Sequence, residues 1–206
     1  CLLSRGLGDV YKRQPFSFAY DIEGSIYGKY LVESKPNAKI GVLYQNDDVG
    51  KSYMRGFRKA LGAKQSNIVK EVSQEMSDPT VDSQILQLQA SGAEVLVAFT
   101  SNKAQAQAIR KAAAIGWKPF YIVPYVSSSI SGVLTPAGLD NSVGLVSSYW
   151  FKTPSDPTWN NDKAMQEYLA FFKKYLPNDD PGDTTSVYTY MLSLIHISEP
   201  TRQEAI

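Results

Sequence analysis

The chain has 206 residues, 43% of them hydrophobic and 20% charged, a globular composition that should bury about 70% of the unfolded surface. Its 21 lysines and arginines nearly balance 20 aspartates and glutamates, so we expect no basic surface for nucleic acid or an anionic membrane. The one cysteine, Cys1, and the one histidine, His196, both lie close to the chain ends.

Between those two residues the sequence has no thiol and no imidazole. This excludes cysteine nucleophiles, Ser-His triads, disulfides and Cys/His zinc sites from the body of the chain. No glycine-rich dinucleotide or P-loop motif follows a predicted strand, and no segment approaches the roughly 20 apolar residues of a membrane span. We therefore expect a protein that is not an enzyme, with no metal, no cofactor and no membrane span.

The two ends of the chain are related through their coding DNA. Residues 9–14 read DVYKRQ and residues 192–197 read LSLIHI, and one DNA segment can encode both hexapeptides, one on each strand. Folding gives no reason for this relation, whereas an inverted repeat flanking an insert does, and both ends resemble translated adapters of sequencing libraries. We expect residues 1–14 and 192–206 to be adapter-like tails without packing. The alternative is that residues 192–197 are an ordinary apolar segment.

The body begins with residues 15–20, PFSFAY, whose alternating aromatic residues predict an extended run. Asp21 is placed to cap a following helix. Apolar residues of that helix are Ile26, Tyr27, Tyr30 and Leu31. Two glycines within it, Gly24 and Gly28, indicate close packing against another element.

Residues 39–62, KIGVLYQNDDVGKSYMRGFRKALG, combine a strand, a polar loop and a helix. Residues 40–44 are apolar, with β-branched and aromatic members, and predict a buried strand. After Gly50 the apolar residues recur at helical spacing, and Gly62 is placed to end the helix. These apolar residues are Tyr53, Met54, Phe57 and Leu61. Ligands of open α/β sheets bind at the carboxyl ends of strands, so this loop is a candidate site.

Two further strands are predicted at residues 68–72 and 95–99, with a helix between them. Asp78 as the cap and Pro79 in the first turn predict where that helix begins. Its buried face is expected to consist of Val81, Ile85 and Leu88, with Gly92 beyond its end. Ser101 or Asn102 can then cap an alanine-rich helix that ends at Gly116.

The last part of the body has weaker patterns. Residues 120–123 predict a fourth strand, residues 127–129 a solvated serine loop, and residues 143–151 a fifth strand. Residues 162–176 predict an amphipathic helix whose inward residues are Met165, Leu169, Phe172 and Leu176. The pattern then breaks off within residues 187–191. Strands that alternate with helices in this way predict an α/β fold with a mostly parallel sheet covered on both faces.

Four separated segments resemble a known family in the same order. They are IGVLYQNDDVGKSYMRGFRKAL, DPTVD, SGAEVLVAF and IRKAAAIGWKPFYIV. Together they resemble the type I periplasmic binding proteins, and most closely the branched-chain-amino-acid-type (Leu/Ile/Val-binding-like) substrate-binding subunits of ABC transporters. The likeness covers nearly all of residues 15–191.

The resemblance implies two α/β lobes joined by three crossing strands, with the ligand bound in the cleft between them. Residues 15–149 would form the second lobe, nearly complete. Residues 150–191 would form the crossover and a partial return to the first lobe, which would be largely missing.

The resemblance and the strand-end loops together select six candidate ligand-binding residues: Asp48, Val49, Thr100, Ser101, Asn102 and Tyr125. Each has a structural alternative. Asp47 and Asp48 can serve as a turn and helix cap, the polar run at 100–102 as an N-cap, and Tyr125 as a packed interface residue. The family usually has an aromatic residue in place of Val49, and amino-acid-binding relatives have an acidic residue in place of Tyr125. Trp150, Phe151 and Trp159 are expected to pack in a core or between lobes.

The function that the resemblance implies is solute binding for an uptake transporter. The ligand would be a small amino acid, amide or carboxylate, and the partners would be the ABC transporter permease subunits. The protein would be a monomer in the periplasm, or lipid-anchored outside the cytoplasmic membrane, with a signal peptide that is not present in this sequence. The alternatives are a ligand-sensing domain of a regulator on the same fold and a small α/β enzyme.

Overall fold

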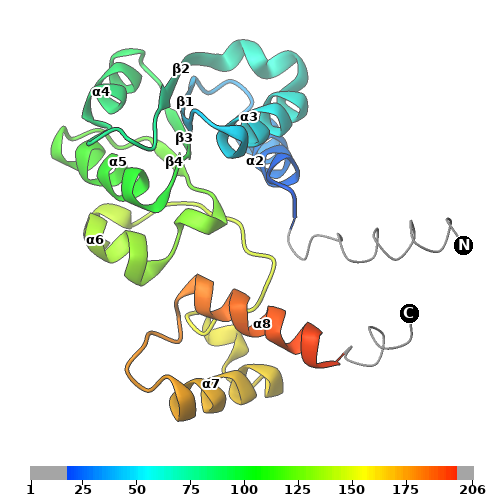
Figure 1. Cartoon of the computed structure of the whole chain (residues 1–206). Helices are drawn as coiled ribbons and strands as arrows, with labels where there is room; N and C mark the ends of the chain where they lie inside the picture. Colours follow the sequence, from blue (N-terminus) through cyan, green and yellow to red (C-terminus); the bar gives the residue numbers. More distant parts are fainter. Residues whose placement is uncertain (1–17, 199–206) are drawn as a thin grey trace, which may run out of the picture.

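The computed structural model describes residues 18–198, which form two bodies (Figure 1). The larger is an α/β body that contains the sheet, and the smaller consists mainly of two helices. Residues 147–156, which have neither helix nor strand, join the two. The expected fold class, an α/β architecture with a parallel sheet flanked by helices, is confirmed.

The sheet has four described strands, β1 (Ile40–Gln45), β2 (Ile68–Gln74), β3 (Val95–Phe99) and β4 (Phe120–Ile122). They lie in the order β2-β1-β3-β4, and all neighbouring pairs are parallel. The central strands β1 and β3 are buried almost throughout. That burial on both faces explains why each reads as a continuous apolar run. The first four predicted strands are confirmed.

The helices of the α/β body are α2 (Tyr20–Ser34), α3 (Asp48–Leu61), α4 (Asp82–Ala90), α5 (Asn102–Ala114) and the short α6 (Thr135–Ala137). The second body contains α7 (Lys163–Tyr175) and α8 (Thr184–Ser198). Short turns of other helix types are η1 (Gly62–Asn67), η2 (Tyr125–Ser127), η3 (Ile130–Leu134), η4 (Leu139–Ser142) and η5 (Pro157–Trp159).

The core of the α/β body has two layers because alternate strand residues point to opposite faces of the sheet. Val42 and Val97 pack with α2 and α3 on one face. Leu43 and Leu96 pack with α4 and α5 on the other. The four residues predicted to face inward on α3 are all buried, as expected, and so are Ile85 and Leu88 of α4 and Val81 just before it.

Helices α2 and α3 pack at unusually short range because glycines remove the side chains between them. A Cβ placed on Gly24 would lie 2.3 Å from the carbonyl oxygen of Tyr53, and one on Gly28 would lie 2.8 Å from that of Phe57. A Cβ on Gly56 would lie 1.8 Å from the carbonyl oxygen of Asp21. The close packing predicted from Gly24 and Gly28 is confirmed.

Two predicted helix starts are wrong. Asp21 lies inside α2, whose N-cap position is occupied by Ala19 without a side-chain cap. Asp78 does not cap α4 either, because its carboxylate accepts a hydrogen bond from the Glu75 backbone N–H at 2.9 Å and closes a turn. The helix begins at Asp82, and the Asp82 N–H donates to the hydroxyl of Thr80 at 3.2 Å. The Asp78 carboxylate closes this local turn in place of the predicted helix cap.

The predicted strand at residues 143–151 is also wrong. Only Val146 forms a parallel bridge, to Ile122. The Val146 N–H donates to the Tyr121 carbonyl and its own carbonyl accepts from the Val123 N–H, both at 2.9 Å. Gly144 just before it has φ 88°, which interrupts an extended run. This segment therefore touches the edge of the sheet at one residue and then leaves it.

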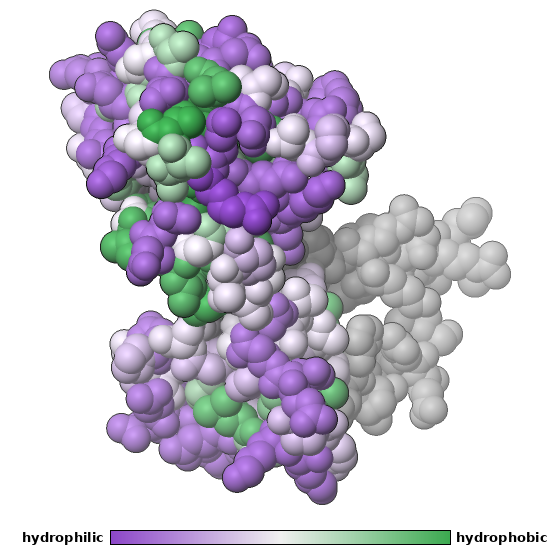
Figure 2. Space-filling view, turned by 90° about the vertical axis from the view of Figure 1, so that its left-hand side faces the viewer, coloured by the Kyte–Doolittle hydropathy of each residue, from purple (hydrophilic) through white to green (hydrophobic). Residues whose placement is uncertain are grey.

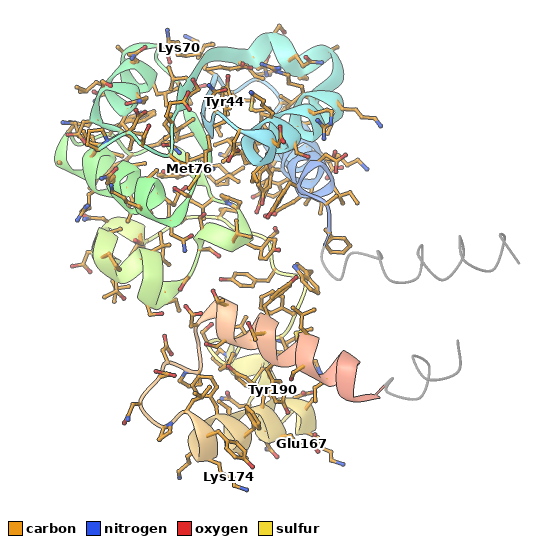
Figure 3. All side chains as sticks on the ribbon, in the orientation of Figure 1. Tyr44, Lys70, Met76, Glu167, Lys174 and Tyr190 are labelled. Carbon is orange, nitrogen blue, oxygen red and sulfur yellow. The ribbon has the colours of Figure 1, made fainter. Side chains whose placement is uncertain are left out.

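In the helical body the predicted inward face of α7 is only half correct. Met165 and Phe172 are buried, whereas Leu169 is 36% and Leu176 is 41% exposed. Tyr168 is buried in their place and its ring packs with that of Tyr190 from α8, at 5.0 Å between centroids. Figure 3 shows Tyr190 between the two helices. Phe151 and Trp159 pack against the same cluster, as expected for packing residues.

The folded body was expected to stop at Met191, but helix α8 runs past that residue. The helix continues to Ser198, and Leu194 on it is 45% exposed. A helix over these residues does not test whether residues 192–206 are an adapter-like tail, and that assignment stays a prediction. Residues 1–17 and 199–206 lie outside the described residues, and so do the expected N-terminal tail, the first half of the run at 15–20, and the end of the C-terminal tail.

Candidate functional site

The candidate residues lie on three loops at one edge of the sheet. Parallel strands end at the same edge, and β1, β3 and β4 are neighbours in the order β1-β3-β4. The loop after β1 leads into α3, whose first two residues are Asp48 and Val49; the loop after β3 carries Thr100 and Ser101 and leads into α5 at Asn102; and the loop after β4 leads to Tyr125 at the start of η2. The structure therefore brings the six predicted residues to a single edge, which we call the ligand edge.

The first loop is fixed by Asp47, which caps α3. Its carboxylate accepts a hydrogen bond from the Gly50 N–H at 2.9 Å. Burial raises its pKa, but the Gly50 N–H and the Gln45 side chain outweigh burial and hold the pKa below its ordinary value. Asp48 and Val49 follow in the first turn, and both are exposed. The cap role expected for the aspartate pair thus belongs to Asp47, while the Asp48 carboxylate faces solvent.

The second loop combines one buried and two accessible polar residues. Thr100 is buried and its hydroxyl donates to the Gln105 side chain at 3.0 Å. Ser101 occupies the N-cap position of α5, but its side chain makes no capping hydrogen bond. Asn102, the first residue of α5, is exposed. The expected side-chain cap is therefore wrong, and the Ser101 hydroxyl is not used for capping.

The third loop places Tyr125 against the segment that joins the two bodies. Tyr125 is buried, and its ring meets those of Trp150 and Phe151 edge-on, with centroids 6.3 and 6.4 Å away. Its backbone N–H donates to the carboxylate of Glu23 at 2.9 Å. The tyrosine is thus a packed residue of the interface between the bodies, as its structural alternative anticipated, and it also lies at the ligand edge.

The serine run at 127–129 is not a solvated loop, because all three side chains are buried. The Ser127 hydroxyl donates to the Thr100 carbonyl at 2.6 Å and so ties the third loop to the second. The Ser128 hydroxyl donates to the Tyr125 carbonyl at 2.8 Å. The Ser129 hydroxyl donates to the Asp183 carboxylate at 2.9 Å. Hydrogen bonds to backbone and carboxylate acceptors, two of them far away in the sequence, explain a burial that composition alone could not indicate.

Sequence reasoning missed one residue beside the ligand edge, Glu23. It lies on α2, is only 3% exposed, and accepts hydrogen bonds from Tyr27, Tyr53, Ser148 and the Tyr125 N–H. Glu23 is therefore a further carboxylate near this edge, besides those of Asp47 and Asp48. A signal was present in the sequence, because Glu23 lies four residues before Tyr27 on the helix that also carries the two packing glycines.

The helical body lies beside the third loop. Ser129 reaches Asp183, which also accepts hydrogen bonds from the Thr185 and Ser186 N–H groups at the start of α8. Trp150 packs edge-on against Tyr188 of the same helix, with centroids 6.2 Å apart. Figure 2 shows the two bodies meeting at a narrow waist. The loop that carries Tyr125 is therefore in direct contact with the second body.

Two hollows in the described surface are lined by other residues. One lies at the amino ends of the strands and is lined by residues such as Lys35 and Glu94. The other lies beside Tyr44, whose side chain is labelled in Figure 3, together with Lys51 and Arg58 of α3. Neither is lined by any of the six candidate residues, and neither is at the junction of the two bodies. These two hollows are therefore separate from the ligand edge.

Among residues 18–198, no group of three or more histidine, cysteine, aspartate or glutamate side chains could hold a metal ion. No described helix combines the length and the apolar character needed to cross a bilayer.

Comparison with known proteins gives a consistent result. A family model described as a periplasmic binding protein matches residues 11–196. A search of curated proteins found no match. Three solved structures are similar to this chain at identities that show the fold alone, and the chain spans less than half the length of each.

The first is a branched chain amino acid ABC transporter from Thermus thermophilus with bound valine, with a TM-score of 0.68, 15% identity, and coverage of 81% of this chain and 42% of that one. The second is a solute binding protein of an ABC transporter from R. palustris in complex with benzoate, with a TM-score of 0.67, 21% identity, and coverage of 83% and 44%. The third is a fatty acid ABC transporter substrate-binding protein from Thermomonospora curvata, with a TM-score of 0.67, 21% identity, and coverage of 84% and 44%.

Proposed function

Because the chain belongs to the periplasmic binding protein family, we propose that it is part of the solute-binding subunit of an ABC uptake transporter. The subunit captures a small ligand between two lobes and delivers it to the membrane permease. One observation carries this proposal: three polar loops share one sheet edge, and one of them contacts a second body. Ligands of α/β sheets bind outside the carboxyl ends of the strands, which is where these loops lie.

We assign residues 15–149 to the second lobe and residues 150–191 to the crossover and the return to the first lobe. The two bodies of the chain support this division, since residues 147–156 form the connection between them. The family implies an extracytoplasmic location and a solute-binding rather than a catalytic role. The permease subunits are the expected partners, and the subunit acts as a monomer.

Six residues form our proposed half of the ligand site: Asp48, Val49, Thr100, Ser101, Asn102 and Tyr125. The first turn of α5 supplies backbone N–H groups without intrahelical partners, which suit an anionic oxygen. The Ser101 hydroxyl, unused by the cap, is a further donor. Tyr125 is largely enclosed by protein, so its contribution would be an apolar ring beside the ligand body. Thr100 contributes through the position of its backbone, because its hydroxyl already bonds Gln105.

The ligand class that this set fits is a small carboxylate, including aromatic acids, rather than an α-amino acid. A buried ammonium group needs an acidic partner, because an unpaired charge out of water costs several kcal/mol. The Glu23 carboxylate is enclosed and accepts four hydrogen bonds from the protein itself. Asp48 is exposed at the rim. Both benzoate and valine occur as ligands of similar structures, so the choice is open to a direct test.

A thermal-shift screen of the full-length protein that contains this sequence tests the ligand class. It compares benzoate and short-chain carboxylates with leucine and valine, since a ligand that binds only the folded state raises the melting temperature. The proposal requires a carboxylate to give the larger shift. Stabilisation by leucine or valine alone would refute the ligand class, and no shift with any solute would refute the transport role.

The regulator alternative places the same lobe in a ligand-sensing domain. It requires an attached effector domain, and no observation on the described residues favours it over a transport subunit.

A further inference from the structure

Glu23 occupies the centre of a hydrogen-bonded cluster behind the ligand edge. Its Oε1 accepts from the Tyr27 hydroxyl at 2.6 Å, the Tyr125 N–H at 2.9 Å and the Ser148 hydroxyl at 3.0 Å. Its Oε2 accepts from the Tyr53 hydroxyl at 2.7 Å. One side chain thus joins α2, α3, the loop after β4 and the segment that leaves the sheet.

We propose that Glu23 is a positioning residue for the ligand edge, one that holds the Tyr125 loop and the connection between the bodies in a fixed mutual position. The role rests on the proposed function only in giving the Tyr125 loop a ligand to meet. Glu23 itself touches no ligand, because it is enclosed by protein donors. It acts through the backbone of Tyr125 and through Ser148.

The first arm of the Glu23 cluster is the Tyr125 loop. Tyr125 lies 102 residues from Glu23 in sequence, and its buried N–H donates to that carboxylate. A buried donor without a partner is strongly unfavourable, so the loop is held where Glu23 places an acceptor. Glu23 is in turn held by α2, which packs closely against α3: a Cβ on Gly24 would lie 2.3 Å from the Tyr53 carbonyl oxygen.

The second arm is the connection between the bodies. Ser148 lies two residues after Val146, the residue that bridges to the sheet. Its hydroxyl bonds Glu23, and its N–H donates to the Tyr27 hydroxyl at 3.2 Å. The Tyr27 hydroxyl also lies 3.1 Å from the Val123 carbonyl, at the end of the strand. Movement of residues 147–149 therefore breaks bonds in the same cluster that fixes Tyr125.

The cluster is built from donors that keep their protons. Burial, and after it the charge of Glu23, raise the pKa of both Tyr27 and Tyr53 far above the ordinary value. Both phenols remain neutral donors across the physiological range. The hydrogen bonds described for the Glu23 carboxylate come from two phenols, one serine hydroxyl and one backbone N–H, with no lysine or arginine among them.

A positioning role and a merely structural role make different predictions, because the cluster has separable arms. The Tyr53 hydroxyl bonds the other carboxylate oxygen, and no hydrogen bond described for it reaches the loop or the connection. Tyr53→Phe should therefore lower stability without changing the loop. Glu23→Gln places an amide N–H₂ among donors and leaves at least one of them without an acceptor. Its effect should concentrate at the Tyr125 and Ser148 amides.

Amide hydrogen exchange of the 206-residue chain, measured by NMR, decides between them without any ligand. In Glu23→Gln we expect the Tyr125 and Ser148 amides to exchange at least about tenfold faster relative to those of Val42 and Val97. Tyr53→Phe should change all four to a similar extent, and the exposed control Glu33→Gln on the same helix should change none. Exchange that rises uniformly in Glu23→Gln, or not at all at Tyr125 and Ser148, would overturn the proposal.

If Glu23→Gln does not fold, Ser148→Ala provides a second test of the positioning role. It removes one arm and leaves the carboxylate in place, so residues 147–149 should exchange faster while Tyr125 stays protected. Unchanged exchange at residues 147–149 would overturn the proposal.

The ligand arm of the experiment uses the full-length protein and benzoate as the probe. Below the melting temperature of each variant, Glu23→Gln should weaken benzoate binding at least about tenfold and Tyr53→Phe by less than about twofold. Equal losses in the two variants would overturn the positioning role. Failure of the unsubstituted protein to bind benzoate would count against the proposed ligand, while the exchange result would still decide the role of Glu23.

Discussion

The contact between α2 and α3 allows a direct prediction for Gly56→Ala. The added methyl group would lie 1.8 Å from the Asp21 carbonyl oxygen and 2.5 Å from its carbonyl carbon, whereas real Cβ atoms essentially never approach closer than 3.0 Å. The obstacle is backbone and cannot rotate away. The two helices must separate by roughly 1 Å in a core packed at crystal density.

The magnitude follows from two opposing effects. Alanine favours a helix over glycine by about 1 kcal/mol, which stabilises the variant. Overpacking of a close contact costs about 1–3 kcal/mol, and more where the backbone must move. We expect the clash to prevail, with a net loss of at least about 2 kcal/mol in the free energy of unfolding.

Urea unfolding of the 206-residue chain, followed by circular dichroism, measures this loss. The matched control is Lys59→Ala, an exposed substitution on the same helix, which should change stability by no more than about 0.5 kcal/mol. A second readout is specific to position: α2 carries Glu23 two residues beyond Asp21, so the Tyr125 amide should also lose protection in Gly56→Ala. Unfolding of Gly56→Ala at the same or a higher urea concentration than the unsubstituted chain would refute the reasoning.

Three other predictions concern the loops. Asp47→Ala removes the cap of α3 and should cost about 1 kcal/mol in urea unfolding. Because the folded pKa of Asp47 lies below the ordinary value of 3.8, its contribution should be full above that pH and fade as pH falls below it, so equal losses at pH 3 and pH 7 would contradict the assignment. Ser127→Ala removes the donor to the Thr100 carbonyl and should cost about 1 kcal/mol, with faster amide exchange at residues 100–102; no change there would contradict the link between the loops. Ser129→Ala should leave the sheet intact but speed exchange at the start of α8, because Asp183 loses its 2.9 Å hydrogen bond from the α/β body and keeps only the 3.4 Å bond from Ser131; unchanged exchange at residues 185–187 would contradict that contribution of Ser129.

The central strands and helix α3 could be predicted because their information is local. β1 and β3 are apolar runs buried on both faces, and the four inward residues of α3 repeat at helical spacing. The glycines of α2 also carried a local signal, since a helix with two glycines on one face needs a close neighbour. In these elements propensity, periodicity and packing agree.

The missed features depend on partners far away in the chain. Ser127 is buried because the Thr100 carbonyl lies opposite, 27 residues away. Glu23 is buried because donors come from four separate segments, up to 125 residues away. Residues 143–151 have strand propensity, but Gly144 and a single bridge at Val146 leave no ladder to join. No short stretch of the sequence contains both partners of these long-range contacts.

The six candidate residues show the same division. Their shared place at one sheet edge follows from strand order and could be anticipated from the alternating pattern. Which of them are accessible could not, because Thr100 and Tyr125 are buried while Asp48 and Asn102 are exposed. Burial of Thr100 follows from its bond to Gln105, one turn into α5, and burial of Tyr125 follows from contact with the connecting segment.

In the proposed function, this chain supplies one side of a two-lobed site for a small carboxylate. Calorimetric titration of benzoate into the full-length protein and into the 206-residue chain tests it most directly. Contacts from both lobes and closure around the ligand should make binding to the full-length protein one-to-one and at least about a hundredfold tighter than binding to the chain. Equal affinities for the two proteins, or tight binding of leucine where benzoate gives no heat, would contradict the account.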